Sequence, residues 1–212
     1  MHSSYLKALF VGSISACFCA ANAQSFVNGN FETGNLSGWT VTPTSNGTTD
    51  VQDAVQYDID AGGPLTTNFA GHFAVAEVNF DSTQQGILLT QYMTLSSGIQ
   101  YTFDFDWAAQ TTGSNAEGGV FSLVVNGSAI VTQSAGNIGA TPIVGHITAL
   151  FTPTSTGSYV VGSSITRPWQ SPGNLFQYVD NFNVSSPVPE PASLLVIALG
   201  AAGFAVRRRT RK

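Results

Sequence analysis

Between residues 24 and 187 the chain has no cysteine, no lysine and a single arginine, Arg167. Both cysteines, Cys17 and Cys19, lie near the amino terminus. Without cysteine, residues 24–187 can form neither a disulfide nor a thiolate centre, so packing and any bound metal must stabilise them. Nucleic-acid binding is excluded, because it needs several lysines or arginines to neutralise phosphates.

The same segment is strongly acidic. Eleven Asp and Glu residues against Arg167 give residues 24–187 a net charge of −10, whereas the whole chain carries −5. Such a charge fits a soluble domain that binds calcium or neutral sugars. It argues against an anionic polysaccharide as a direct ligand unless cations bridge the two.

Motifs of common enzymes are also missing. The chain has no Gly-x-Ser-x-Gly, no His-Glu-x-x-His, no phosphate-binding loop and no Gly-rich dinucleotide turn. Two histidines, His72 and His146, stand alone between residues 24 and 187. We therefore expect no enzymatic activity. The open alternative is a glycan hydrolase that pairs Glu77 with Asp104 or Asp106, and this depends on the separation of the carboxylates.

The carboxyl-terminal end has three parts in order. Pro189, Glu190 and Pro191 form an extended tripeptide, since proline disfavours helix in itself and in the preceding residue. An apolar run of 15 residues, 192–206, follows, and residues 207–212 are basic. We expect the run to form a short transmembrane helix with its basic end in the cytoplasm and the preceding domain outside.

This tail resembles the PEP-CTERM sorting signal of exported proteins from Gram-negative bacteria that make extracellular polysaccharide. Pro189, Glu190 and Pro191 match the family tripeptide, and residues 192–206 and 207–212 match its helix and basic cluster. The resemblance implies recognition by an exosortase, a membrane protease that removes the tail. It also implies transient anchoring in the inner membrane through residues 192–206, then a place at the cell envelope, outer surface or extracellular matrix. An ordinary carboxyl-terminal membrane anchor is the alternative.

The amino-terminal end is typical of a secretory signal peptide, residues 1–23. It has a lone Lys7, an apolar stretch over 8–21, and Ala21-Asn22-Ala23 as a cleavage site for signal peptidase. The alternative is a lipobox, residues 14–17, which would make Cys17 a lipidated amino terminus.

Alternation of apolar and polar residues predicts strands throughout the middle of the chain. Tyr101, Phe103, Phe105 and Trp107 alternate with polar residues, and residues 176–184 repeat the pattern. Asn126-Gly127 between two apolar runs predicts a two-residue hairpin. The other predicted strands are 39–42, 51–57, 72–78, 87–95, 120–125, 129–133, 147–152 and 159–165. The fold class is therefore all-β: one antiparallel sandwich of jelly-roll type, residues 24–184, with a linker at 185–188 and a terminal helix at each end.

Both ends of this domain resemble galactose-binding-like jelly rolls, which include carbohydrate-binding modules. Residues 27–34 and 36–39 match their opening, and residues 176–184 match their last strand. In several such modules a first-strand Glu and a last-strand Asp bind a structural calcium. Carried over, this implies Glu32 and Asp180 as metal ligands. Calcium needs six to eight oxygens, so Asn30 or Asp53 is a candidate for a further ligand.

Asp180 has the same phase in its predicted strand as two large apolar residues, Tyr178 and Phe182. If these face the core, Asp180 does too, and a buried carboxylate needs a metal, a counter-ion or hydrogen bonds. The alternative is that it caps a loop at the strand end.

Candidate ligand contacts lie in two loops. Residues 166–174 place Trp169 beside Arg167, and an exposed aromatic ring next to polar groups suits a sugar. Residues 110–118 hold Glu117, which we include as a third ligand-binding candidate. Trp39 and Trp107 are predicted to be in the core.

Three functions are compatible with the sequence. The leading one is an exported, non-catalytic protein that binds carbohydrate, with extracellular polysaccharide as partner. A purely structural or adhesive surface protein without a small ligand is the second, and a glycan-active hydrolase is the third.

Overall fold

A computed structural model describes residues 24–60, 62–63, 68–78, 84–113, 116–168 and 174–186. The chain divides into two compact units, Met1–Asn22 with Pro189–Lys212, and Ala23–Val188. Every described residue lies in the second unit. The predicted signal peptide, the Pro-Glu-Pro tripeptide and the apolar run 192–206 lie outside the described residues. Among those that are described, the search for a helix able to cross a membrane finds none.

The described residues form strands and no helix. The strands are β1 (Thr40–Pro43), β2 (Gly47–Gln56), β3 (Phe69–Glu77), β4 (Gln85–Leu95), β5 (Tyr101–Thr111), β6 (Ala116–Glu117), β7 (Val120–Val125), β8 (Ser128–Ser134), β9 (Asn137–Ile138), β10 (Ile143–Phe151), β11 (Gly157–Arg167) and β12 (Leu175–Ser185). Each of the ten predicted strands is present. The two that were not predicted, β6 and β9, have two residues each, and β6 falls within residues 110–118, which were predicted to be a loop.

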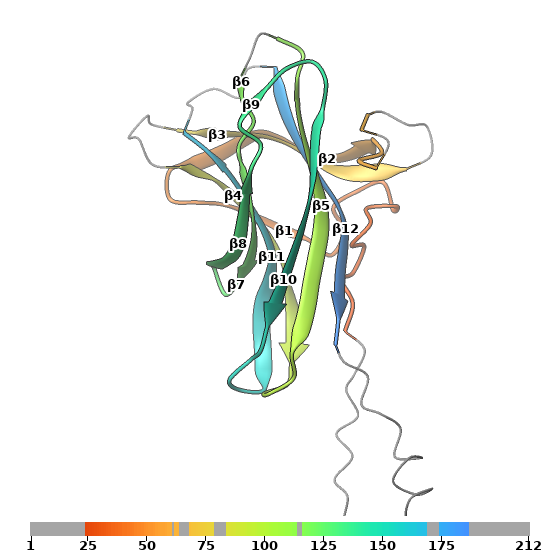
Figure 1. Cartoon of the computed structure of the whole chain (residues 1–212), viewed down its shortest axis with the longest axis vertical. Coiled ribbons are helices and arrows are strands. Elements are labelled where there is room, and N and C mark those ends of the chain that lie inside the picture. The colour runs from red at the N-terminus through yellow and green to blue at the C-terminus, as the bar shows by residue number, and fades with distance from the viewer. Residues whose placement is uncertain are drawn as a thin grey trace, which may run out of the picture. The chain divides into compact units, whose positions relative to one another are not determined.

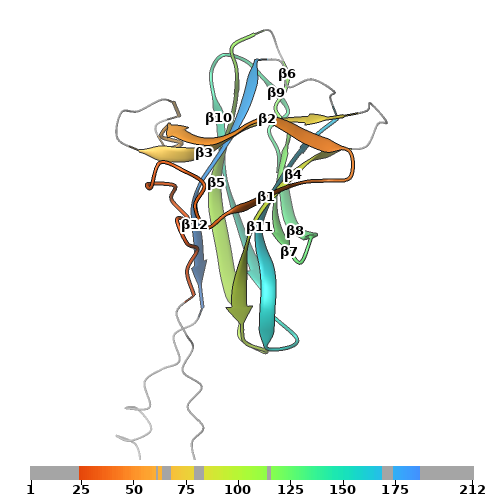
Figure 2. The same cartoon turned by 180° about the vertical axis from the view of Figure 1, so that it is seen from behind.

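Two five-stranded antiparallel sheets pack face to face (Figures 1 and 2). Sheet I has the order β1-β4-β11-β7-β8, and sheet II has the order β10-β5-β12-β3-β2. The short pair β6-β9 forms a separate ribbon. This arrangement confirms the predicted antiparallel jelly-roll sandwich.

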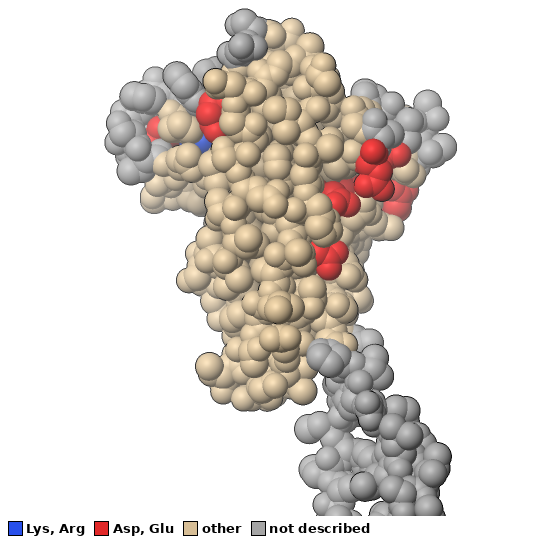
Figure 3. Space-filling model, viewed as in Figure 1, with Lys and Arg blue, Asp and Glu red and all other residues tan. Residues whose placement is uncertain are grey.

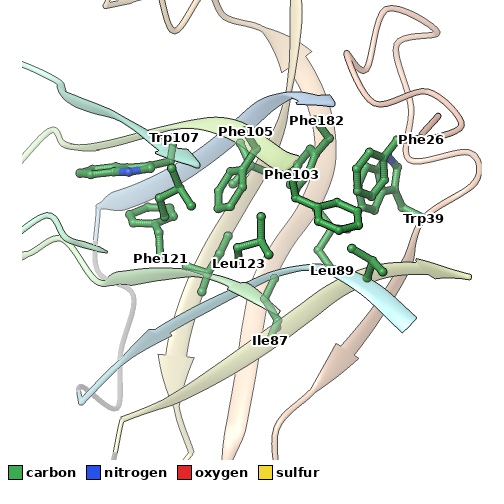
Figure 4. Close-up of a cluster of buried hydrophobic side chains, with 14 of the residues drawn as sticks. Phe26, Trp39, Ile87, Leu89, Phe103, Phe105, Trp107, Phe121, Leu123 and Phe182 are labelled. Carbon is green, nitrogen blue, oxygen red and sulfur yellow. The ribbon is translucent and has the colours of Figure 1, made fainter. Parts of the chain in front are cut away.

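The core lies between the sheets and follows from the alternation in the sequence. On β5, Phe103, Phe105 and Trp107 are buried and point inward, whereas Asp104 and Asp106 point away. They meet apolar side chains of sheet I, including Ile87, Leu89, Phe121 and Leu123 (Figure 4). Aromatic rings are packed in direct contact; Trp107 and Phe121 stack with centroids 4.5 Å apart.

An aromatic cluster closes one end of this core. Trp39 stacks between Phe26 and Phe31, with centroids 5.4 and 5.6 Å apart, and lies 4.5 Å from the Phe182 ring. Its indole Nε1 donates a hydrogen bond of 3.0 Å to the carbonyl of Asn28. The predicted core positions of Trp39 and Trp107 are therefore confirmed. All members of both hydrophobic clusters lie within residues 26–184, so the domain contains its own core.

The hairpin predicted at Asn126-Gly127 is also present. Both residues have positive φ, 49° and 77°, as a two-residue turn between antiparallel strands requires. This turn joins β7 to β8, whose pairing begins at Val125 and Ser128.

Candidate functional site

The five strands of sheet I carry no Asp, Glu or Lys. Their one ionisable cation, Arg167, is only 4% exposed, at the end of β11. All described acids lie instead on sheet II, on β6, or in the segments that flank sheet II. In Figure 3 most of the acidic atoms gather along the right-hand side, where Figure 1 labels β2 and β12, a second group lies at the upper left beside the blue atoms, and most of the visible surface is uncharged. The outer surface of sheet I is therefore neutral in a domain of net charge −10.

We call this outer surface the neutral face, and the strand register defines its residues. Cα partners on β4 and β11 are Leu88↔Ser164, Thr90↔Gly162, Tyr92↔Val160 and Thr94↔Ser158. The alternate residues of the same strands, such as Leu89 and Val161, belong to the core. The neutral face continues to Thr40 and Thr42 on β1 and to Ser122 and Thr132 on β7 and β8.

The most exposed large side chain of the neutral face is Tyr92. Its exposed fraction is 80%, and among the described residues it is the one aromatic residue that is exposed. The outer face of sheet II also has aromatic rings, but they cover one another. Tyr57 stacks on Tyr178 with centroids 3.7 Å apart, and both are buried. Tyr92 is thus free to meet a ligand, whereas the aromatic rings of sheet II are not.

Hydroxyl groups surround this ring. Thr40, Thr42, Thr94 and Ser158 are exposed or nearly so, and Thr90, Ser122 and Ser164 lie deeper, 5–9% exposed. Ser122 and Thr132 hydrogen-bond to each other across β7 and β8, with 2.9 Å between the hydroxyl oxygens. An aromatic platform flanked by uncharged hydroxyls can stack on a sugar ring and exchange hydrogen bonds with its hydroxyls.

Arg167 and Glu117, two of the three residues predicted to bind ligand, lie close together. Arg167 donates through Nη1 to the carbonyl of Val75, at 3.3 Å. Burial lowers the pKa of Arg167, and the charge of Glu117 opposes this effect. Burial raises the pKa of Glu117, against a backbone hydrogen bond from Gly119 and the charge of Arg167.

These contacts place Arg167 inside the sandwich rather than at its surface. Trp169, the third predicted contact, lies outside the described residues. The role of all three in ligand binding stays a prediction.

Two further buried polar residues accompany Arg167. Gln177 is fully buried, accepts a 3.0 Å hydrogen bond from the Val75 N–H, and donates to the carbonyl of Gly118 at 3.4 Å. Glu77 is fully buried and accepts a 3.1 Å hydrogen bond from Asn46. Sequence reasoning missed this cluster, although the signal existed: Gln177 and Glu77 are polar residues at the phase of apolar core residues in their strands.

Replacing Arg167 with Met should destabilise the domain by about 1–3 kcal/mol, because it leaves the Val75 carbonyl without its charged donor and the half-buried Glu117 without its positive neighbour. Urea denaturation of residues 24–186 measures this free energy. Arg167→Lys, which keeps the charge, should lose less. A loss below about 1 kcal/mol for Arg167→Met would show that the pair does not stabilise the fold.

The hydrolase alternative required facing carboxylates. Glu77 lies at the core phase of β3, whereas Asp104 and Asp106 project from the outer face of β5, so these acids do not face one another. Asp106 instead pairs with His146, at 2.7 Å between Oδ1 and Nδ1. His72 makes the equivalent pair with Asp53, also at 2.7 Å.

Asp180 is buried, but not for the reason that strand phase suggests. The pairing of β12 with β5 shifts register between Asp180 and Asn183, and Asn181 has a positive φ of 54°. Because of this bulge, Tyr178 joins a cluster on the outer face of sheet II, while Phe182 enters the main core. The two neighbours therefore point to different sides of the sheet.

The carboxyl group of Asp180, 6% exposed, lies among other acids. Burial raises its pKa to about 8; a 2.7 Å hydrogen bond from the Asn181 N–H opposes the rise, and the negative charges of Glu32, Asp106 and Asp60 add to it. The structure thus brings Glu32 within electrostatic reach of Asp180, as the calcium prediction requires.

Glu32 and Asp53, the other acidic candidates for calcium ligands, have hydrogen-bond partners of their own. Glu32 accepts a 3.0 Å hydrogen bond from the Phe69 N–H, and Asp53 is paired with His72 rather than turned toward Asp180. Within the described ranges no three or more His, Cys, Asp or Glu side chains form a group able to hold a metal ion. Calcium binding stays a prediction, and backbone carbonyls would have to supply most of the ligands.

Comparison with known proteins identifies the tail. The PEP-CTERM protein-sorting motif matches residues 187–209, which confirms the sequence interpretation of Pro189, Glu190 and Pro191. The motif implies that the chain is exported, held transiently at a membrane, and processed by an exosortase. No curated protein matches the chain.

Among solved structures, the chain is similar to TmCBM61 in complex with β-1,4-galactotriose, at 16% identity, over 77% of this chain and 99% of that one, with a TM-score of 0.46. It is similar to the Stig cyclase Fisc from Fischerella sp. TAU, at 15% identity, 79% and 100% coverage and a TM-score of 0.47. The third is the CBM22-1 xylan-binding domain from Paenibacillus barcinonensis Xyn10C, at 9% identity, 77% and 95% coverage and a TM-score of 0.41. These TM-scores are below 0.5, so the proposals that follow rest on the residues of this chain.

Proposed function

We propose that the exported domain is a non-catalytic protein that binds neutral extracellular polysaccharide on the neutral face, with Tyr92 as the stacking platform. One observation supports this most: among the described residues, the one exposed aromatic residue stands on the sheet whose outer surface carries no charge. The sorting motif on the same chain is consistent with work outside the cell.

Charge supports a neutral ligand. An anionic chain would be repelled by a domain of net charge −10, because no exposed lysine or arginine is present between residues 24 and 187 to offset the acids. A neutral sugar meets no such penalty on sheet I. Its hydroxyls can replace water at Thr40, Thr42, Thr94 and Ser158 without leaving a charge desolvated.

The form of the neutral face supports a polymer rather than a small molecule. Ligands of drug size usually bind in concave pockets that bury most of their surface. Here the hydroxyls extend over five strands, with neighbouring strands about 4.8 Å apart. A chain of several sugar units can contact such a surface at several points.

We also propose that a calcium ion between Glu32 and Asp180 stabilises the domain. The negative charges of three carboxyl groups, Glu32, Asp106 and Asp60, act on the carboxyl group of Asp180, and a cation would relieve their repulsion. The ion would join the amino-terminal segment to β12 and would have no part in sugar binding.

A glycan array tests the proposed function directly. Purified residues 24–186 should bind neutral polysaccharides and ignore those built from uronic acids, with and without calcium. Preference for acidic glycans would contradict the charge argument. Binding to no glycan under either condition would favour a purely structural or adhesive surface protein.

A further inference from the structure

A second candidate site lies on sheet II, beside β12. A pocket of about 320 Å³ is formed by Ser25, Phe26, Asn28, Gly29 and Asn30 of the amino-terminal segment and by Phe182, Asn183 and Val184 of β12. The neutral face belongs to sheet I, so the two sites use different sheets and share no residue.

The bulge in β12 creates the space for this pocket. β3 pairs with β12 over Gln177–Val179, and the amino-terminal segment lies beside β12 beyond the bulge, where the Phe182 N–H donates to the carbonyl of Gly29 at 2.9 Å. The approach is so close that a Cβ on residue 29 would come within 2.5 Å of the Phe182 carbonyl oxygen. Glycine is therefore required at position 29.

Hydrogen bonds fix the wall that faces β12. The amide of Asn28 donates to the carbonyl of Asn35 at 2.8 Å, and its Oδ1 accepts from the Thr33 N–H at 3.3 Å. The Asn28 carbonyl also accepts the indole hydrogen bond of Trp39. The pocket wall is thus held by the aromatic cluster of the core and does not depend on a ligand for its shape.

The lining has no charged residue and combines three apolar residues, Phe26, Phe182 and Val184, with polar ones. Ser25 supplies a hydroxyl and Asn30 an exposed amide. Asn183 is exposed and donates through Nδ2 to Asp104 at 3.1 Å, which orients its Oδ1 as an acceptor. Amides and hydroxyls without a cation recognise hydroxyl groups and cannot neutralise a phosphate or a carboxylate.

The volume of the pocket limits the size of the ligand. A volume of about 320 Å³ is at the lower end of the range for ligand pockets, about 300–1,000 Å³, so it suits one sugar ring better than a chain. We infer that the pocket between Ser25–Asn30 and Phe182–Val184 binds a single neutral sugar unit, at a chain end or side branch.

The consequence for function rests on the proposed polysaccharide binding of sheet I. One domain would then hold a polymer chain on the neutral face and a terminal unit of another chain in the pocket. Two sites on one rigid sandwich that bind different chains would cross-link those chains.

NMR spectroscopy of isotope-labelled residues 24–186 tests the pocket, with free neutral monosaccharides and their methyl glycosides as probes. At least one should shift the amide signals of residues 25–30 and 182–184, with a Kd of about 1 mM. Asn183→Ala, at an exposed side chain, should weaken that binding about ten-fold, and Tyr92→Ala should leave it unchanged. Unaltered signals with every sugar at about 10 mM, ten times this Kd, would overturn the inference.

The experiments can refute the pocket and the neutral face independently of each other. If the array shows no polysaccharide binding but the monosaccharide shifts persist, the pocket stands and the cross-linking role falls. Ser25→Trp, which places a large side chain at the exposed rim, is the second variant: it should abolish the shifts while its thermal stability stays at the wild-type value. Persistence of the shifts in a folded Ser25→Trp domain would also refute the pocket.

Discussion

Tyr92→Ala is expected to lower the affinity of the domain for neutral polysaccharide at least ten-fold while leaving its stability unchanged. The ring is 80% exposed, so its removal creates no cavity in the core. Tyr92 is also an exposed aromatic residue on the neutral face, and aromatic residues often supply a large share of the binding free energy at an interface. A ten-fold loss corresponds to about 1.4 kcal/mol. Affinity electrophoresis measures the binding, and thermal unfolding measures the stability.

Two matched variants serve as controls: one removes only the hydroxyl group of Tyr92, and the other changes a neighbouring side chain. Tyr92→Phe keeps the stacking surface and should retain most of the affinity, whereas Thr94→Ala, on the same face of β4, should cost less than Tyr92→Ala. Equal affinity of Tyr92→Ala and the wild-type domain would remove Tyr92 from the site.

In calcium-free buffer the wild-type domain should lose stability as the pH rises from about 4 to about 8. The pKa of Asp180 is about 8 in the folded domain, and the reference value is 3.8. Between these values the folded state holds a proton that the unfolded state has released, so raising the pH favours unfolding. The contribution is fully present below the reference pKa and is lost through the folded pKa. At 1.36 kcal/mol per pKa unit, the full loss is on the order of 5 kcal/mol.

Calcium should weaken this pH dependence. A cation bound to the Asp180 carboxylate displaces the proton, so calcium should raise the melting temperature more at pH 8.5 than at pH 5. Asp180→Asn should remove both the loss of stability with pH and the effect of calcium. Asp50→Asn, at an exposed acid of β2, is the control and should retain both.

Urea unfolding at several pH values, with calcium or with EDTA, checks these expectations. If Asp180→Asn follows the same pH curve as the wild-type domain, Asp180 is not the group responsible. If calcium has no effect at pH 8.5, the metal proposal falls while the proton-linked effect remains.

Much of the fold could be predicted from local patterns. The alternation in β5 set its core face correctly, and Asn126-Gly127 set the β7–β8 hairpin. The order of strands within the sheets could not be predicted, because β4 pairs with β11 and β12 with β3 across long stretches of sequence. Such pairings depend on the whole core rather than on any one segment.

Tyr92 shows why the candidate site was harder to find than the fold. Its strand is apolar at both phases, with Leu88 and Tyr92 on one side and Leu89 and Met93 on the other, so periodicity cannot tell which side is buried. Packing of Leu89 and Met93 in the core decides it. Asp180 illustrates the reverse problem, since a bulge that no sequence signal marked changes the phase of β12.

The most direct test of the central claim is amide hydrogen exchange on residues 24–186 with and without a neutral oligosaccharide selected from the array. Ligand should slow exchange in β1, β4 and β11 around Tyr92 and leave the opposite sheet around β2 and β3 unchanged. Slower exchange confined to β2, β3 and the carboxyl-terminal half of β5, with β4 unaffected, would contradict the account.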